Sequence, residues 1–89
     1  MSTWNVTLTR RACKQLFKLP AVIQDLADMA IADLEARGPI ISGWNVRKTA
    51  EQEYRVRLTY RYRMRYHLLT EDTLEIEIFY IGHRKDAYR

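Results

Sequence analysis

The strongest constraint on this chain is a strict alternation of apolar and polar residues from Tyr54 to Leu68. Even-numbered positions are apolar or aromatic, whereas odd-numbered positions are polar and mostly arginine. Successive side chains of a β-strand point to opposite faces, so the pattern predicts one buried and one polar face. Because fifteen residues exceed a usual strand, we expect a turn near Thr59–Arg61 and therefore an antiparallel hairpin.

The parity of the pattern also predicts the register of this hairpin. A two-residue turn would mix the two faces, so the loop needs an odd residue count or a compensating bulge. A three-residue loop at Thr59–Arg61 sets Arg57 opposite Arg63 and Arg55 opposite Arg65. Like charges at directly opposed positions destabilise a sheet. We therefore interpret this face as arranged for an external anion.

A second hairpin is expected between this segment and Leu74–Ile81. If residue 68 pairs with residue 74, Arg65 faces Glu77 and His67 faces Glu75. Arg65 is therefore predicted to form a mainly structural ion pair with Glu77. The alternative is that the charged face is only the solvated side of the sheet. A guanidinium suits phosphate, because it can donate two parallel hydrogen bonds to it. The arginines that this register leaves without a partner therefore form the predicted anion-binding cluster: Arg55, Arg57 and Arg63.

The first half of the chain is typical of a short strand followed by two helices. Apolar residues alternate up to Leu8, and Thr9 is a suitable cap for a first helix. A second helix is expected from Pro20, with apolar residues at helical spacing, until Gly38 and the following proline end it. Trp44–Lys48 is a further short candidate strand. We predict a single domain, residues 1–89, of α+β class: one antiparallel-dominated sheet, in the order strand, helix, helix and three further strands, packed on a two-helix hairpin.

Composition excludes several classes of protein. The single cysteine, Cys13, cannot form an internal disulfide, and there is no apolar run of signal-peptide or membrane-span length. We therefore expect a cytoplasmic protein without membrane contact. Two histidines and one cysteine supply little metal chemistry, and no nucleotide-binding glycine motif is present. No metal or cofactor is predicted. Eleven arginines against four lysines at a net charge of +4 indicate an anionic partner.

The C-terminal stretch from Gly82 concentrates groups that are able to carry out chemistry. His83 and Tyr88 are suited to proton transfer, and Arg84 is suited to holding a phosphate. The alternative is a solvated tail, as chain ends often are.

The element order, together with YRVRL, YRMRY and GHRKDAYR, resembles the RelE/ParE superfamily of bacterial toxin–antitoxin toxins over nearly the whole chain. The resemblance implies a RelE-like fold and a ribosome-dependent endoribonuclease, an mRNA interferase. Such enzymes cleave messenger RNA without metal, by attack of the 2′-hydroxyl on the adjacent phosphate. It also implies a cognate antitoxin protein as partner. The matching positions are Arg55, Arg57, Arg63, Arg84 and Tyr88.

One departure from the family pattern shifts the expected chemistry. Well-known RelE toxins have lysines where this chain has Arg55 and Arg57. An arginine stays charged and is a poor base, so we expect these two side chains to clamp phosphate and His83, Tyr88 or both to move protons. The basic residues of the first helix are expected to contact ribosomal RNA backbone: Arg10, Arg11 and Lys14. The alternatives are a ParE-like DNA gyrase inhibitor and a non-catalytic, basic RNA-binding module.

Overall fold

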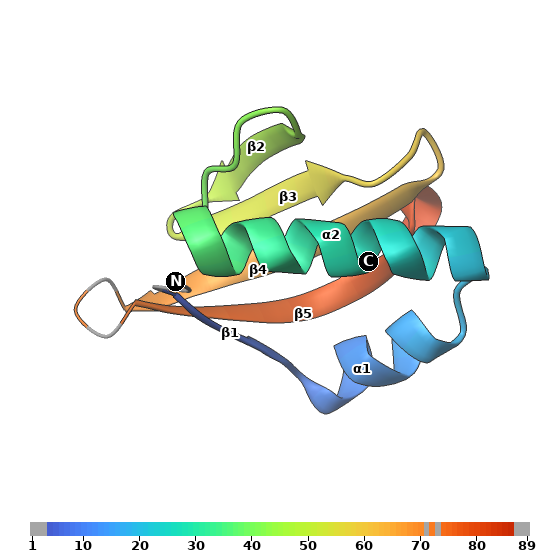
Figure 1. Ribbon diagram of the computed structural model, residues 1–89, viewed down its shortest axis with the longest axis horizontal. Helices are drawn as coiled ribbons and strands as arrows, with labels where there is room; N and C mark the ends of the chain where they lie inside the picture. Colours follow the sequence, from blue (N-terminus) through green and yellow to red (C-terminus); the bar gives the residue numbers. More distant parts are fainter. Residues whose placement is uncertain (1–3, 71, 73, 87–89) are drawn as a thin grey trace.

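The computed structural model describes residues 4–70, 72 and 74–86. Five strands form one sheet in the order β1-β5-β4-β3-β2 (Figure 1). β1 runs parallel to β5, and the other neighbouring strands are antiparallel. This confirms the predicted α+β class and the antiparallel-dominated sheet, but four strands follow the two helices instead of the predicted three. The elements are β1 (Asn5–Leu8), α1 (Arg10–Phe17), α2 (Ala21–Arg37), β2 (Asn45–Ala50), β3 (Glu53–Arg57), β4 (Tyr62–Thr70), β5 (Glu75–His83) and the short 3₁₀ helix η1 (Arg84–Asp86).

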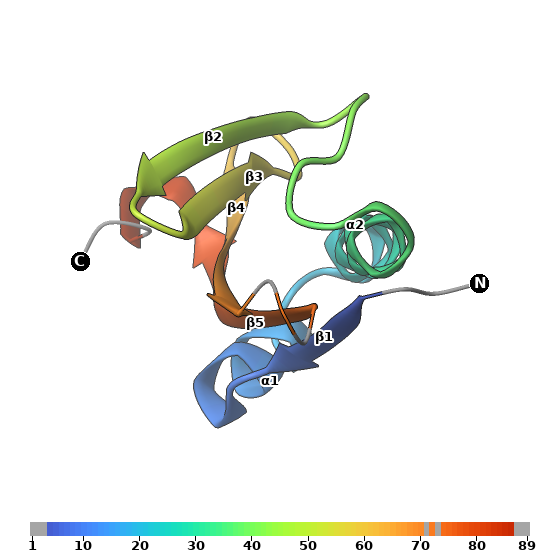
Figure 2. The same ribbon diagram turned by 90° about the vertical axis from the view of Figure 1, so that its left-hand side faces the viewer.

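The two helices cover different parts of the sheet. The sheet is curved, with α2 on its concave side and α1 beside β5 (Figure 2). β1 pairs only with the first four residues of β5, and α1 then continues along β5. The side-chain oxygen of Gln15 accepts the backbone N–H of Ile81 at 2.9 Å. A helix side chain thus satisfies a strand N–H that β1 is too short to reach. Thr9 caps α1 as predicted, because its hydroxyl accepts the Ala12 N–H at 3.1 Å.

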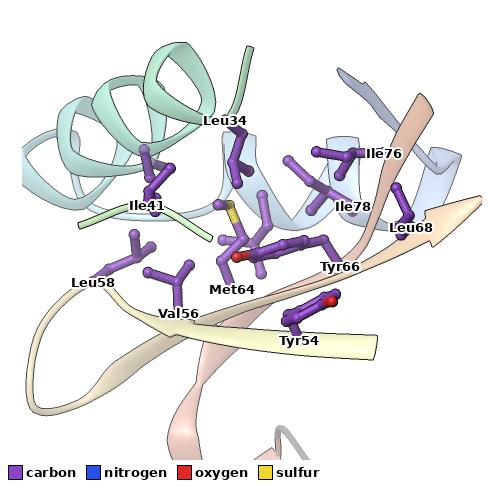
Figure 3. Packing of buried hydrophobic residues seen from close by; sticks show 14 of the residues in the cluster. Leu34, Ile41, Tyr54, Val56, Leu58, Met64, Tyr66, Leu68, Ile76 and Ile78 are labelled. Atoms are coloured by element: carbon purple, nitrogen blue, oxygen red, sulfur yellow. The ribbon is translucent and has the colours of Figure 1, made fainter. Parts of the chain in front are cut away.

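The apolar side of the alternating segment forms the core against α2 (Figure 3). The rings of Tyr54 and Tyr66 stack with centroids 5.7 Å apart. The hydroxyl of Tyr66 donates to the carbonyl of Pro39 at 2.5 Å, and burial raises the pKa of this hydroxyl. Burying each large side chain of this kind stabilises the fold by about 2 kcal/mol. Tyr54 and Tyr66 therefore serve packing.

The first hairpin has the predicted register. Arg57 lies opposite Arg63, and Arg55 lies opposite Arg65. The loop closes where the backbone N–H of Leu58 donates to the carbonyl of Tyr62 at 3.0 Å. Three residues lie between this pair, so the expected three-residue loop is confirmed.

The predicted register of the second hairpin is wrong. Leu68 pairs with Ile76 rather than with residue 74, which places His67 opposite Glu77. Bulges on either side of this stretch shift the strands, and at one of them Phe79 is an additional residue next to Tyr80. Arg65 consequently forms its ion pair with Glu53 of β3 and not with Glu77. Arg65 therefore still forms a structural ion pair, but its partner lies on β3 and not on β5.

The end of α2 gives a stability prediction. Gly38 has φ +92°, and a Cβ there would lie 2.8 Å from Cε2 of Trp4, whereas Gly43 has φ +88° and open space around it. We expect Gly38→Ala to lower the free energy of unfolding by about 3 kcal/mol, since it adds overpacking to backbone strain. Gly43→Ala carries the strain alone and should cost about 1 kcal/mol. Urea denaturation of both variants measures the difference; equal losses would show that the ring of Trp4 moves aside freely.

Candidate functional site

One end of the sheet collects residues from four elements. β3 ends at Arg57, β4 begins at Tyr62 and β5 ends at His83, and the register aligns these positions across the sheet. The loop between β3 and β4 lies at this same end (Figure 1). η1 follows directly with Arg84. The structure therefore brings together candidate residues that lie almost thirty positions apart in the chain.

Arg63 does not project from this end as a free anion ligand. Its side chain is 6% exposed. Nη1 donates to the carbonyls of Thr59 at 2.6 Å, Tyr60 at 2.9 Å and Tyr62 at 3.3 Å. The sequence-based prediction that Arg63 has no internal partner is wrong, because the odd loop that sets the register also turns its carbonyls towards this side chain.

His83 lies on the Tyr62 side of the sheet end. The two residues are directly opposed, and their rings meet edge to face with centroids 5.8 Å apart. Nδ1 of His83 accepts the backbone N–H of Lys85 at 3.2 Å. In the neutral ring this contact places the proton on Nε2. The His83 carbonyl accepts the hydroxyl of Tyr80 at 2.8 Å, so both the backbone and the ring of His83 are held in place.

A hollow of about 440 Å³ lies between α1 and the end of β5. Arg11 and Lys18 line it from the helix, and Gly82 and His83 line it from the strand. The guanidinium of Arg11 also lies 5.7 Å from the ring centre of Tyr80. The volume of the hollow lies within the usual range for small-ligand sites. The hollow therefore joins cationic side chains to a group that is able to transfer protons.

The basic side of α1 continues beyond this hollow. A second hollow of about 380 Å³ runs along the helix. It is lined by the predicted residues Arg10, Arg11 and Lys14, together with Gln15 and Lys18. The predicted basic residues of the first helix thus share one surface. Lys18 extends this basic surface.

The polar side of the sheet carries a row of three arginines. Arg47 of β2 lies opposite Arg55 of β3, which lies opposite Arg65 of β4. Arg47 was missed, although its odd position in the candidate strand Trp44–Lys48 is the signal that relates it to the arginine face. Towards the sheet end, Arg57 is exposed and its neighbours across the sheet are Asn45 and Arg63.

The other end of the sheet differs in charge. There Arg65 is paired with Glu53, and Nε2 of His67 lies 2.8 Å from an oxygen of Glu77. These contacts compensate the positive charge at that end. The exposed basic residues at the His83 end instead face solvent, so an anionic ligand is favoured there.

Tyr88 lies outside the described residues. Within residues 4–70, 72 and 74–86, no three histidine, cysteine, aspartate or glutamate side chains are grouped as metal ligands. Nor is any helix of that part long and apolar enough to cross a membrane.

Comparison with solved structures shows where this fold has been seen. The chain superposes on a chain of the archaeal RelE–RelB complex from Pyrococcus horikoshii OT3 with a TM-score of 0.78 and 22% identity, covering 96% of this chain and 99% of that chain. For the RelB–RelE antitoxin–toxin complex from Methanococcus jannaschii the TM-score is 0.75 with 20% identity, covering 92% and 94%. For the YoeB dimer from Staphylococcus aureus the TM-score is 0.75 with 14% identity, covering 91% of this chain and 97% of that chain.

No family model and no curated protein matches the sequence. At identities of 22% and below, the structural likeness shows the fold and not the activity. The RelE-like architecture expected from the sequence motifs is thereby confirmed.

Proposed function

We propose that this protein is the toxin of a toxin–antitoxin pair and an endoribonuclease that cleaves messenger RNA on the ribosome. The observation that carries the proposal is the hollow that joins Arg11 and Lys18 to His83. Cations next to a group able to transfer protons are what phosphodiester cleavage requires. The RelE-like fold and the match of Arg55, Arg57 and Arg84 to the family pattern support the same activity.

The proposed reaction is attack of a ribose 2′-oxygen on the adjacent phosphorus. The P–O5′ bond breaks, which leaves a 2′,3′-cyclic phosphate on one fragment and a 5′-hydroxyl on the other. One group takes the proton from the 2′-hydroxyl, and another gives a proton to O5′. We assign these transfers to His83 and Tyr88, since the arginines remain charged. Arg11 and Lys18, which line the hollow together with His83, stabilise the charge that develops on the phosphate, and Arg57 contributes to binding the RNA.

We also propose a cognate antitoxin as the protein partner. The solved structures from Pyrococcus horikoshii OT3 and Methanococcus jannaschii are complexes with RelB. At the junction of α1 and α2, Phe17 is 74% exposed and Val22 is 68% exposed. Large apolar side chains on a surface are typical of protein contacts. A small acidic reading frame beside the gene, whose product restores growth, would support this partner.

Primer extension on a defined messenger RNA, with and without ribosomes, tests the activity. We expect new 5′ ends only when ribosomes and protein are both present. A ParE-like gyrase inhibitor would instead produce DNA damage and intact messenger RNA. A non-catalytic RNA-binding module would bind RNA and produce no new ends under any condition.

The arginine face gives a prediction for binding. Arg57→Glu should weaken binding to single-stranded RNA by about tenfold, because it replaces a positive charge with a negative one next to the phosphate backbone of the RNA. Lys48→Glu changes the net charge equally but lies opposite Tyr54 on the other side of the sheet. Titrations at several salt concentrations, analysed for affinity and salt dependence, measure both variants. Equal losses would show that only the net charge matters and that the face has no specific role.

A further inference from the structure

The tip of the loop between β3 and β4 presents an aromatic ring to solvent. Tyr60 is 64% exposed, whereas the tyrosines at positions 54, 66 and 80 are buried in or near the core. An exposed tyrosine at a loop tip contributes little to stability, since most of its ring remains in water. Its position therefore calls for an explanation other than packing.

The loop that carries this ring is held by several hydrogen bonds. The buried guanidinium of Arg63 donates to the carbonyls of Thr59 and Tyr60. The hydroxyl of Thr59 accepts the backbone N–H groups of Arg61 and Tyr62, each at 3.2 Å. The backbone N–H of Arg84 donates to the carbonyl of Arg61 at 2.7 Å. Burying a guanidinium has a desolvation cost. The hydrogen bonds of the buried Arg63 offset this cost and hold the surface loop in one conformation.

The same contacts place a cation on the ring. The guanidinium carbon of Arg84 lies 4.4 Å from the ring centre of Tyr60. At this separation a guanidinium is attracted to the π face of the ring. Both residues are exposed, so a flat aromatic surface and a positive charge face solvent together. They adjoin His83, which directly precedes Arg84 in the chain.

We propose that Tyr60 and Arg84 form a preorganised stacking site for one base of the bound RNA. The site rests on the proposed function, since it places a base beside the phosphate to be cleaved. Single-stranded RNA is recognised largely by stacking of unpaired bases on aromatic rings and guanidinium planes. A rigid loop lowers the entropy lost on binding. Because stacking reads no base edge, this site positions the strand and tolerates different bases.

The alternative is that Arg84 stacks on Tyr60 only to anchor η1. The two roles make different predictions. An anchoring contact affects the thermal stability of the protein but is indifferent to the ligand. A stacking site makes affinity depend on a base at one position of the RNA.

Binding of a short 2′-O-methyl RNA, which lacks the attacking hydroxyl, provides the test. The RNA is a hexamer, and its affinity is measured at low salt. The intact hexamer is compared with hexamers that carry a single abasic residue at each position in turn. For the wild-type protein we expect one position at which removal of the base weakens binding by about tenfold or more. Tyr60→Phe should keep this base dependence. Tyr60→Leu, which retains an apolar side chain for Arg84 but no π face, should lose it.

Phe17→Leu is the matched control, because Phe17 is also an exposed aromatic residue but lies on α1. It should leave the base dependence unchanged. If the wild-type protein binds all abasic hexamers as well as the intact one, or if Tyr60→Leu retains the dependence, the stacking site is wrong. Primer extension decides the proposed function separately: cleavage without base dependence refutes only the stacking site, and base dependence without cleavage refutes only the ribonuclease.

Discussion

His83→Ala is expected to lower the rate of ribosome-dependent cleavage by about 100-fold or more, because it removes one of the two groups that transfer protons. The ring is exposed to the hollow beside Arg11 and Lys18 and is held there by Lys85 and Tyr62. Single-turnover cleavage of messenger RNA on saturating ribosomes measures the effect on chemistry apart from binding. Tyr88→Phe should give a loss of similar size if that hydroxyl is the second group.

The second histidine provides the control for this experiment. His67 lies at the opposite end of the sheet with its ring 2.8 Å from Glu77. His67→Ala should therefore leave the cleavage rate within about twofold of the wild type, since a half-buried polar residue at the opposite end of the sheet has no contact with the site. Near-normal cleavage by both His83→Ala and Tyr88→Phe would refute the assignment of the proton transfers.

Arg63→Met is expected to lower the free energy of unfolding by about 3 kcal/mol. The substitution removes charged hydrogen bonds to the carbonyls of Thr59 and Tyr60 and leaves these acceptors without their partner. Such a loss is a large part of the stability of a small domain. Urea denaturation measures it. Cleavage should fall as well, because the loop that carries Tyr60 loses its anchor.

Arg57→Met separates this structural role from phosphate binding. Arg57 is the direct neighbour of Arg63 across the hairpin and is exposed. Its replacement should change the free energy of unfolding by about 0.5 kcal/mol or less while still weakening RNA binding. A stable Arg63→Met variant that is impaired only in cleavage would contradict the structural role and return Arg63 to the set of direct phosphate ligands.

Local patterns were sufficient for much of the fold. The parity of the alternating segment predicted the three-residue loop and the pairing of Arg57 with Arg63, because side-chain direction in a strand depends only on position. The same reasoning failed for the next hairpin. Whether a bulge is present depends on how both strands pack, and the bulge at Phe79 moved the partner of Arg65 to another strand.

The site was predictable as a set of residue types but not as an arrangement. The sequence shows an excess of arginines at odd positions and a histidine beside Arg84. It does not show that Arg63 is buried under its own loop or that Arg84 rests on Tyr60. Sequence reasoning counted both arginines as free phosphate ligands, because a guanidinium that binds carbonyls or an aromatic ring looks the same in a sequence as one that faces solvent.

The sequence by itself determined the alternating strands, the helix boundaries at Thr9 and Gly38, and the separation of a basic face from an apolar one. These features depend on residues a few positions apart, where backbone geometry relates sequence to direction. Only the tertiary structure decided that β1 lies parallel to β5 and that α1 brings Arg11 next to His83. Contacts between residues about seventy positions apart depend on the packing of the whole chain, and no local pattern encodes them.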